Sequence, residues 1–342
     1  MTKKYDTLVF IGRFQPVHTA HLEIIKRASE LAKQVILIVG SANQPRTYKN
    51  PFSSQEREIM LREVIYESAI YSAGVRIEHN YDTIYNDQAW SVRVQALVAK
   101  HSLPNDKIGI IGHDKDESTF YLKMFPQWGK EEVELVEPLN ATNIRDLFFK
   151  RDVNLNFLTS VVPVSTINFL GKFMNTPDFE QIVREREFVE AYKKQYASLP
   201  YPPIFVTSDA VVIQSGHVLM IKRKAEPGRG LWALPGGFVN ANTDRSVKDA
   251  MLRELREETG IKVPAPVLAG SIQDSHVFDA VDRSSRGRTI THAFKIVLPD
   301  GELPKVKGSD DAEKARWVPI AEVRSEECFE DHYEIIQHFV GA

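Results

Sequence analysis

The sequence predicts an α/β protein of two domains, an N-terminal doubly wound parallel sheet and a C-terminal mixed α+β domain. The chain has 342 residues, which is more than the usual length of one domain. In the first half, short apolar runs alternate with helical patterns, as they do where helices cross a parallel sheet. The prolines of 199–203 then interrupt the chain, and β-branched and aromatic runs follow.

The first fifty residues predict a strand, a helix and a second strand. The apolar run 8–11 is typical of a strand buried on both faces, and apolar residues recur at helical spacing through 22–31. The run 35–39 follows about thirty residues after the first strand, which is the size of a βαβ unit. Two later runs, 108–111 and 133–136, predict further strands of the same parallel sheet.

A charged helical pattern spans 179–197, and the prolines after it end the helix because they cannot continue one. We therefore expect a first domain at 1–180, a helical and proline-rich linker at 181–203, and a second domain at 204–342.

The second domain should contain strands, one central helix and a C-terminal helix. The helices are expected at 246–259 and near 329–340. The strands are expected at the β-branched and aromatic runs 204–213, 218–221, 291–298 and 315–320.

Composition narrows the classes of function. The formal net charge of −3 provides no electrostatic footprint for nucleic acid or for an anionic membrane. The single cysteine, Cys328, fits a reducing compartment. We find no signal peptide and no apolar stretch long enough to span a membrane. The sequence thus predicts a soluble cytoplasmic protein, and it leaves the oligomeric state open, with a homo-oligomer among the alternatives.

The first candidate site lies where strand 8–11 becomes a helix. His18 and His21 are three residues apart, so both imidazoles should lie on one side of the first helical turn. The start of a helix offers free N–H groups to a phosphate. The loop lacks the glycine pattern of a dinucleotide fold and the G-K-[ST] ending of an NTPase loop, so it predicts a nucleotide site of another kind.

Polar groups also follow two other predicted strands. Strand 108–111 runs into Gly112, His113 and Asp114. Beyond strand 133–136, Thr142 could cap a helix and Arg145 could face the same edge of the sheet. Because ligands of such sheets bind outside the carboxyl ends of the strands, we expect these groups to converge with the histidines.

These motifs resemble a known family. GRFQPVHTAH at 12–21 and TNIR at 142–145 look like the two signatures of the HxGH nucleotidyltransferases. GRFQP, NPF at 50–52 followed by ER, and GHDKD are similar to the archaeal-type nicotinamide mononucleotide adenylyltransferases. The resemblance covers about residues 5–170, and Ala20 stands where the family usually has glycine.

This resemblance implies transfer of AMP from ATP to nicotinamide mononucleotide, giving NAD and pyrophosphate, with Mg²⁺ on the triphosphate. It implies that His18 and His21 hold ATP phosphates, that Arg145 with Thr142 holds the β/γ end, and that Trp90 stacks on the nicotinamide ring. A core position is the alternative for Trp90. The remaining nucleotide-binding residues that it implies are Gly12, Arg13, Phe14, Gly112, His113 and Asp114. A transferase for another phosphate acceptor is the rival interpretation.

The second candidate site is a cluster of carboxylates on the predicted helix 246–259. Glu254, Glu257 and Glu258 fall at i, i+3 and i+4, where like charges destabilise a helix unless a cation neutralises them. Three hard oxygen ligands suit Mg²⁺, with Mn²⁺ as an alternative ion, and Arg253 can orient the cluster. A solvated, salt-bridged helix face is the other interpretation.

The frame around this cluster, LPGG at 234–237 and RELREETGI after it, looks like the Nudix box. The resemblance covers about residues 204–342 and implies a hydrolase of nucleoside diphosphates linked to another group. There is one departure: two extra residues separate Gly237 from Arg253, so the glutamate that the family places in this loop falls on Arg245 or Thr243.

A basic loop indicates the substrate. Arg283, Arg286 and Arg288 lie in a segment similar to the loop of ADP-ribose-cleaving Nudix proteins, which implies hydrolysis of ADP-ribose to AMP and ribose 5-phosphate. A flexible charged hairpin is the alternative for the loop. The order of the two domains resembles the bifunctional enzymes of NAD metabolism. The alternative for the whole chain is an adenylyltransferase with a non-catalytic Nudix-like module that senses ADP-ribose or NAD.

Overall fold

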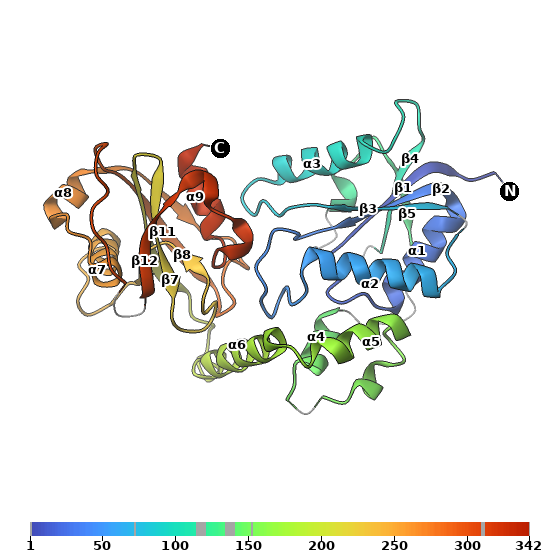
Figure 1. Cartoon of the computed structure of the whole chain (residues 1–342), viewed down its shortest axis with the longest axis horizontal. Helices are drawn as coiled ribbons and strands as arrows, with labels where there is room; N and C mark the ends of the chain where they lie inside the picture. The colour runs from blue at the N-terminus through green and yellow to red at the C-terminus, as the bar shows by residue number, and fades with distance from the viewer. Residues whose placement is uncertain are drawn as a thin grey trace. The chain divides into compact units, whose positions relative to one another are not determined.

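The computed structural model describes residues 2–71, 73–113, 121–133, 141–151, 153–308 and 312–341. The chain divides into two compact units, Met1–Arg184 and Glu185–Ala342 (Figure 1). This division falls inside the segment 181–203, for which the sequence predicts a linker.

The first unit is built on a five-stranded parallel sheet with the order β3-β2-β1-β4-β5. Because β2 and β3 extend the sheet to one side of β1 and β4 and β5 to the other, the strand order reverses between β1 and β4, where ligands of such sheets bind. The strands are β1 (Tyr5–Gly12), β2 (Ala32–Val39), β3 (Gly74–His79), β4 (Ile108–Gly112) and β5 (Gly129–Glu132).

The structure confirms the strands expected at 8–11, 35–39 and 108–111. The strand expected at 133–136 is found earlier, at Gly129–Glu132, and 134–136 lie outside the described residues. The sequence analysis missed β3 because this edge strand is half-exposed and carries polar residues.

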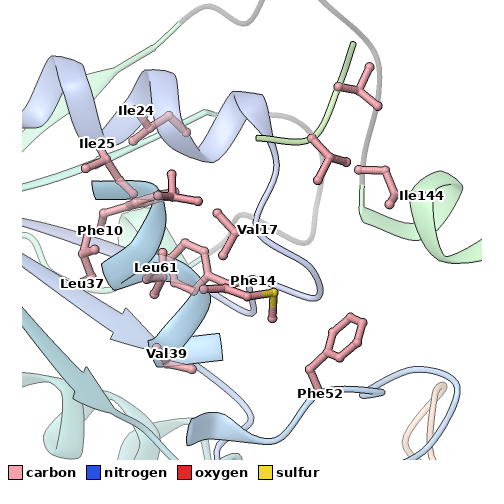
Figure 2. Packing of buried hydrophobic residues seen from close by; sticks show 14 of the residues in the cluster. Phe10, Phe14, Val17, Ile24, Ile25, Leu37, Val39, Phe52, Leu61 and Ile144 are labelled. Carbon is pink, nitrogen blue, oxygen red and sulfur yellow. The ribbon is translucent and has the colours of Figure 1, made fainter. Parts of the chain in front are cut away.

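Helices cover both faces of this sheet (Figure 1). Alternate residues of β1 and β2 pack on α1, α2, α4 and α5, and the intervening ones pack on α3. Figure 2 shows the first of these clusters, with Phe10 from β1, Ile25 from α1, Leu37 from β2 and Leu61 from α2. The helices are α1 (Thr19–Leu31), α2 (Ser54–Glu67), α3 (Asp87–Ala99), α4 (Ala141–Phe148), α5 (Val164–Phe173) and α6 (Pro177–Lys194).

The second unit contains a mixed seven-stranded sheet with the main order β10-β11-β6-β7-β12, while β8 pairs with β7 and β9 with β6. β11 and β6 are parallel, and the other pairs are antiparallel. The strands are β6 (Phe205–Gln214), β7 (His217–Arg223), β8 (Trp232–Ala233), β9 (Gly236–Phe238), β10 (Ile272–Phe278), β11 (Thr289–Val297) and β12 (Ala312–Pro319).

Two apolar clusters join this sheet to helices on its two faces. Ala210, Val212 and Phe294 pack on α7 (Val247–Thr259) and α8 (Ala265–Gly270), whereas Val211 and Met220 pack on α9 (His332–Val340). The expected strands and the two expected helices are present, and the mixed α+β domain is confirmed.

The second half of α6 and the residues just after it belong to the second unit. The Glu185 carboxylate accepts a hydrogen bond from the Gly228 N–H at 3.3 Å. The rings of Tyr192 and Tyr196 lie 5.7 and 5.2 Å from the ring of Phe205 at the start of β6. This unit therefore begins before the proline-rich segment.

Candidate functional site

The loop after β1 has a conformation that only particular residues permit. A Cβ on Gly12 would lie 2.9 Å from the Phe14 ring, so glycine is required there. Phe14 has φ +53°, is 1% exposed, and its ring centroid lies 4.8 Å from that of His21. Phe14 was expected to bind nucleotide, and its buried ring packs against His21. Arg13, in contrast, is exposed.

The two expected histidines lie together at the start of α1. His18 is the N-cap, its main-chain N–H donates to Nδ1 of His21 at 3.2 Å, and the two rings stack with centroids 3.6 Å apart. Because Nδ1 accepts a hydrogen bond, the proton of a neutral His21 ring is on Nε2. Desolvation, with the neighbouring His18, lowers the pKa of His21 well below its usual value. His21 is thus a neutral donor at physiological pH.

Arg145 reaches this loop from α4. Its Nη1 donates to the Gln15 carbonyl at 2.9 Å and its Nη2 to the Thr142 hydroxyl at 3.1 Å, while its buried Nε makes no hydrogen bond. Burial, with the charge of Arg13, lowers the pKa of Arg145 to about 10. Thr142 lies inside the first turn of α4 and holds Arg145; it is not the cap. The structure therefore brings the two separated motifs together.

The end of β4 is partly described. Gly112 is its last residue, and the Gly112 carbonyl accepts from the Val133 N–H at 3.0 Å. The His113 Nδ1 bonds the Val133 carbonyl at 2.9 Å, so this ring joins the ends of two neighbouring strands. Asp114 lies outside the described residues.

Trp90 lies on α3 and is half-buried. Its ring is 6.2 Å from that of Tyr121 and 6.3 Å from that of Phe125, at the border of the cluster beneath α3. Part of the indole therefore packs in the core, and the rest remains accessible for stacking.

In the second unit, two glycines allow β9 to lie close to β6 and to the carboxylates of α7. A Cβ on Gly237 would lie 2.7 Å from the Glu254 carboxyl carbon, and one on Gly236 would lie 2.3 Å from the Ser208 carbonyl. The Gly236 N–H donates to Glu258 at 2.9 Å. Burial raises the pKa of Glu258 to about 8. The LPGG turn is thus needed for this close approach.

Arg253 has a partner that the sequence analysis missed. Asp244 accepts from its Nε at 2.9 Å and from its Nη2 at 2.8 Å, and this pairing lowers the pKa of Asp244 to about 2. The extra residues form a turn in which Asp244 and Asn240 bond each other's main-chain N–H groups. Neither Thr243 nor Arg245 makes the contact to Arg253. Asp244, the acidic residue between these two positions, was the feature of the sequence that could have identified the partner of Arg253.

The three glutamates are not assembled as a ligand set. Arg253 binds Glu254 at 2.8 Å and Glu257 at 3.0 Å, and among the described residues no three His, Cys, Asp or Glu side chains are gathered to hold a metal. The donor chemistry nevertheless fits a divalent cation. All three are hard oxygen ligands, and burial raises the pKa of Glu254 and Glu258, so a cation would stabilise their charged forms.

The basic loop separates into residues of different roles. Arg283 was expected to bind ADP-ribose; its side chain is 3% exposed and forms a bidentate ion pair with Asp331 at 2.7 and 2.8 Å, so it holds the loop to the start of α9. The Arg286 guanidinium lies 4.9 Å from the Phe238 ring centroid. Arg288 is half-buried, and its Nη1 makes no hydrogen bond. This anchoring favours an ordered loop over a flexible hairpin.

Comparisons with known proteins agree with a nucleotidyltransferase joined to a Nudix unit. The chain belongs to the cytidylyltransferase-like family, which its residues 9–209 match, and residues 204–339 match the NUDIX domain. Within this class, it belongs to the family of a bifunctional NMN adenylyltransferase/ADP ribose pyrophosphatase from Francisella tularensis. That structure is 38% identical, with a TM-score of 0.91 over 98% of this chain and 99% of the other.

Two further matches are informative. A structure of a bifunctional NMN adenylyltransferase/ADP ribose pyrophosphatase from Francisella tularensis, complexed with AMP and a Mn ion, is 36% identical, with a TM-score of 0.89 over 98% of this chain and 99% of the other. The nicotinamide/nicotinic acid mononucleotide adenylyltransferase of Acinetobacter baylyi is 39% identical over 180 residues, 52% of this chain and 92% of that protein.

Proposed function

We propose that the first unit transfers AMP from ATP to nicotinamide mononucleotide, giving NAD and pyrophosphate. The observation that carries this proposal is the convergence of the His18–His21 pair and Arg145 on one loop at the carboxyl end of β1. The mononucleotide phosphate attacks the α-phosphorus of ATP in line, and pyrophosphate leaves, so the reaction needs no protein nucleophile. The neutral Nε2–H of His21 and the guanidinium of Arg145 stabilise the charge that develops on the phosphates.

The test is chromatography of the full-length protein incubated with ATP, Mg²⁺ and either nicotinamide or nicotinic acid mononucleotide. From nicotinamide mononucleotide we expect NAD and pyrophosphate in equal amounts, and from the acid we expect nicotinic acid adenine dinucleotide and pyrophosphate, with the amide used at least as well as the acid. A Glu258→Gln variant is the control, because it changes the other unit and should leave NAD formation intact. A lack of dinucleotide product with either acceptor refutes the proposal.

For the second unit we propose hydrolysis of ADP-ribose, in which water adds across the diphosphate to give AMP and ribose 5-phosphate. The support is the cluster of Glu254, Glu257 and Glu258 against the Gly236–Gly237 turn, with Arg253 oriented by Asp244. These glutamates would hold Mg²⁺ or Mn²⁺, which polarises a diphosphate and activates water. Arg286, beside Phe238, is the arginine of the basic loop best placed to contact the substrate.

AMP release from ADP-ribose, with and without a chelator, tests this reaction. Glu258→Gln keeps the shape of the side chain and removes the carboxylate that would hold the cation, so hydrolysis should collapse while NAD formation persists. If the parent protein binds ADP-ribose but releases no AMP with either metal ion, the unit is a sensor and the hydrolase proposal fails.

We further propose that Mg²⁺ is the ion used in the cell, that the partners are ATP, the mononucleotide and ADP-ribose, and that the protein works in the cytoplasm. The support for a reducing location is the single cysteine, Cys328, which is buried and unpaired with another cysteine. No helix in the described part of the chain has the length and apolarity to cross a membrane.

A further inference from the structure

Helix α2 contains a buried arginine, Arg57, that has no assigned role in either of the two proposed reactions. Arg57 is 1% exposed and donates to the carbonyl groups of Arg13 at 2.7 Å, Gly40 at 2.6 Å, Ser41 at 3.1 Å and Ser53 at 3.2 Å. In the described ranges, no carboxylate forms an ion pair with it. A buried arginine usually pairs with an acid, whereas here main-chain carbonyls satisfy it.

Three of these carbonyls follow β1 and β2, the neighbouring strands whose carboxyl ends lie at the ligand edge of the sheet. Arg13 comes directly after β1, and Gly40 and Ser41 come directly after β2. The two loops also contact each other, because the Gly40 N–H donates to the Gly12 carbonyl at 2.9 Å. The Arg57 guanidinium thus binds both loops through their carbonyl groups. It also adds positive charge at a place where the carbonyl oxygens alone would repel an anionic ligand.

The same loops contain strained backbone. Phe14 has φ +53° and Ser41 has φ +50°, in the left-handed region that residues other than glycine rarely adopt. Such conformations persist only where the surrounding structure holds them. Phe14 is anchored in the apolar cluster that it shares with Val39 and Leu61 (Figure 2). Arg57 donates hydrogen bonds to the carbonyl of Ser41 and to the carbonyl of Arg13, the residue before Phe14.

We propose that Arg57 is a positioning residue for AMP transfer, which fixes the loops after β1 and β2 so that Arg13 and His18 meet the ATP phosphates in one geometry. This inference rests on the proposed adenylyl transfer in the first unit. A lysine cannot replace this arginine, because its ammonium is a single point on a flexible stem and cannot span several carbonyls of two loops.

The test compares Arg57→Lys with Arg62→Lys in the full-length protein. Arg62 is an exposed arginine of the same helix, which binds Glu58 at 2.7 Å, and its variant should behave as the parent. For Arg57→Lys we expect kcat/KM for ATP to fall about 10²-fold, the effect of a displacement of about 1 Å in a reacting geometry. The loss should include a raised KM for ATP. ADP-ribose hydrolysis should be unchanged.

A purely structural role predicts a different pattern, because partial unfolding lowers the apparent kcat but leaves KM for ATP at the parental value. A second variant, Arg57→Lys combined with Ser41→Gly, should recover part of the lost activity, since glycine adopts φ +50° without strain. A parental KM for ATP in Arg57→Lys overturns the inference, as does unfolding of both variants. If the parent protein itself forms no NAD, the adenylyl-transfer proposal fails and this inference falls with it.

Discussion

The ion pair of Asp244 with Arg253 provides a sharp test of the Nudix site. The change Asp244→Asn keeps the shape of the side chain and removes its charge. Two charge-assisted hydrogen bonds, at 2.9 and 2.8 Å, become weaker or are lost. Hydrogen bonds to charged groups contribute about 1.5–3 kcal/mol when they are buried. The Arg253 side chain is 28% exposed and retains Glu254 and Glu257, so we expect a net loss of about 1–2 kcal/mol in the stability of this unit.

The effect on activity should be larger than the effect on folding. Without Asp244, Arg253 is drawn fully to Glu254 and Glu257, and it then competes with the metal ion for the same oxygens. Loss of a group that orients metal ligands costs about 10- to 100-fold, so kcat/KM for ADP-ribose should fall by that factor. Higher Mn²⁺ concentration should recover part of the loss. The assay is AMP release over a Mn²⁺ series, with urea unfolding measured on the same samples.

Asp249→Asn is the matched control. Asp249 lies in the first turn of α7 and also pairs with an arginine, but the side chain of its partner Arg245 is 89% exposed and lies 3.4 Å away. Such surface pairs contribute about 0–1 kcal/mol, so this variant should keep the parental activity. Parental activity of Asp244→Asn at every metal concentration, or equal losses in both variants, would refute the orienting role of Asp244.

Three further predictions concern other parts of the chain. Changing His18 or His21 to Ala should each lower kcat for NAD formation by about 10²–10³, the loss expected for one preorganised donor, while ADP-ribose hydrolysis stays parental. The fragment 185–342 should be more stable to urea than 200–342 by about 2–4 kcal/mol, because residues 185–199 supply the Glu185 carboxylate that accepts a hydrogen bond and the rings of Tyr192 and Tyr196 that contact Phe205; equal midpoints would contradict this. Burial lowers the pKa of His332 to about 3, and its ring accepts a main-chain N–H at 2.8 Å. Since the unfolded chain binds this proton below about pH 6.5 and the folded one does not, stability should fall by about 1.4 kcal/mol per pH unit from pH 6.5 towards 3. His332→Asn should remove that slope in urea unfolding at several pH values, and an unchanged slope would disprove the assignment.

Several elements could be predicted from the sequence because local residues determine them. β1 and β2 contain the continuous apolar runs 8–11 and 35–39, which are buried on both faces as their pattern indicates. Helix α7 begins after Ser246, which caps it, and ends at Gly260, whose φ of +54° suits the stop that its position predicts. The spacing of His18 and His21 likewise predicted that both rings lie together; His18 is the N-cap of α1, and an N-cap residue and the residue three positions later meet in a capping box.

Other elements have no local signal. β8 and β9 are only two and three residues long, and they exist because they pair with β7 and β6. The edge strand β3 is polar and half-exposed, so its pattern does not distinguish it from a loop. In these cases the neighbouring strand, and not the segment's own residues, selects the conformation.

The sequence by itself therefore determined the fold class, the order of the two units and the local motifs of each site. Tertiary structure alone decided which distant groups meet: Arg145 with the Gln15 carbonyl, Arg57 with the loops after β1 and β2, and Asp244 with Arg253. The physical reason is that side-chain direction is periodic in a helix or a strand but not in a loop. Counting residues along the family motif leads to Thr243 or Arg245, on either side of Asp244. Only the folded turn determines which side chain of this segment faces Arg253.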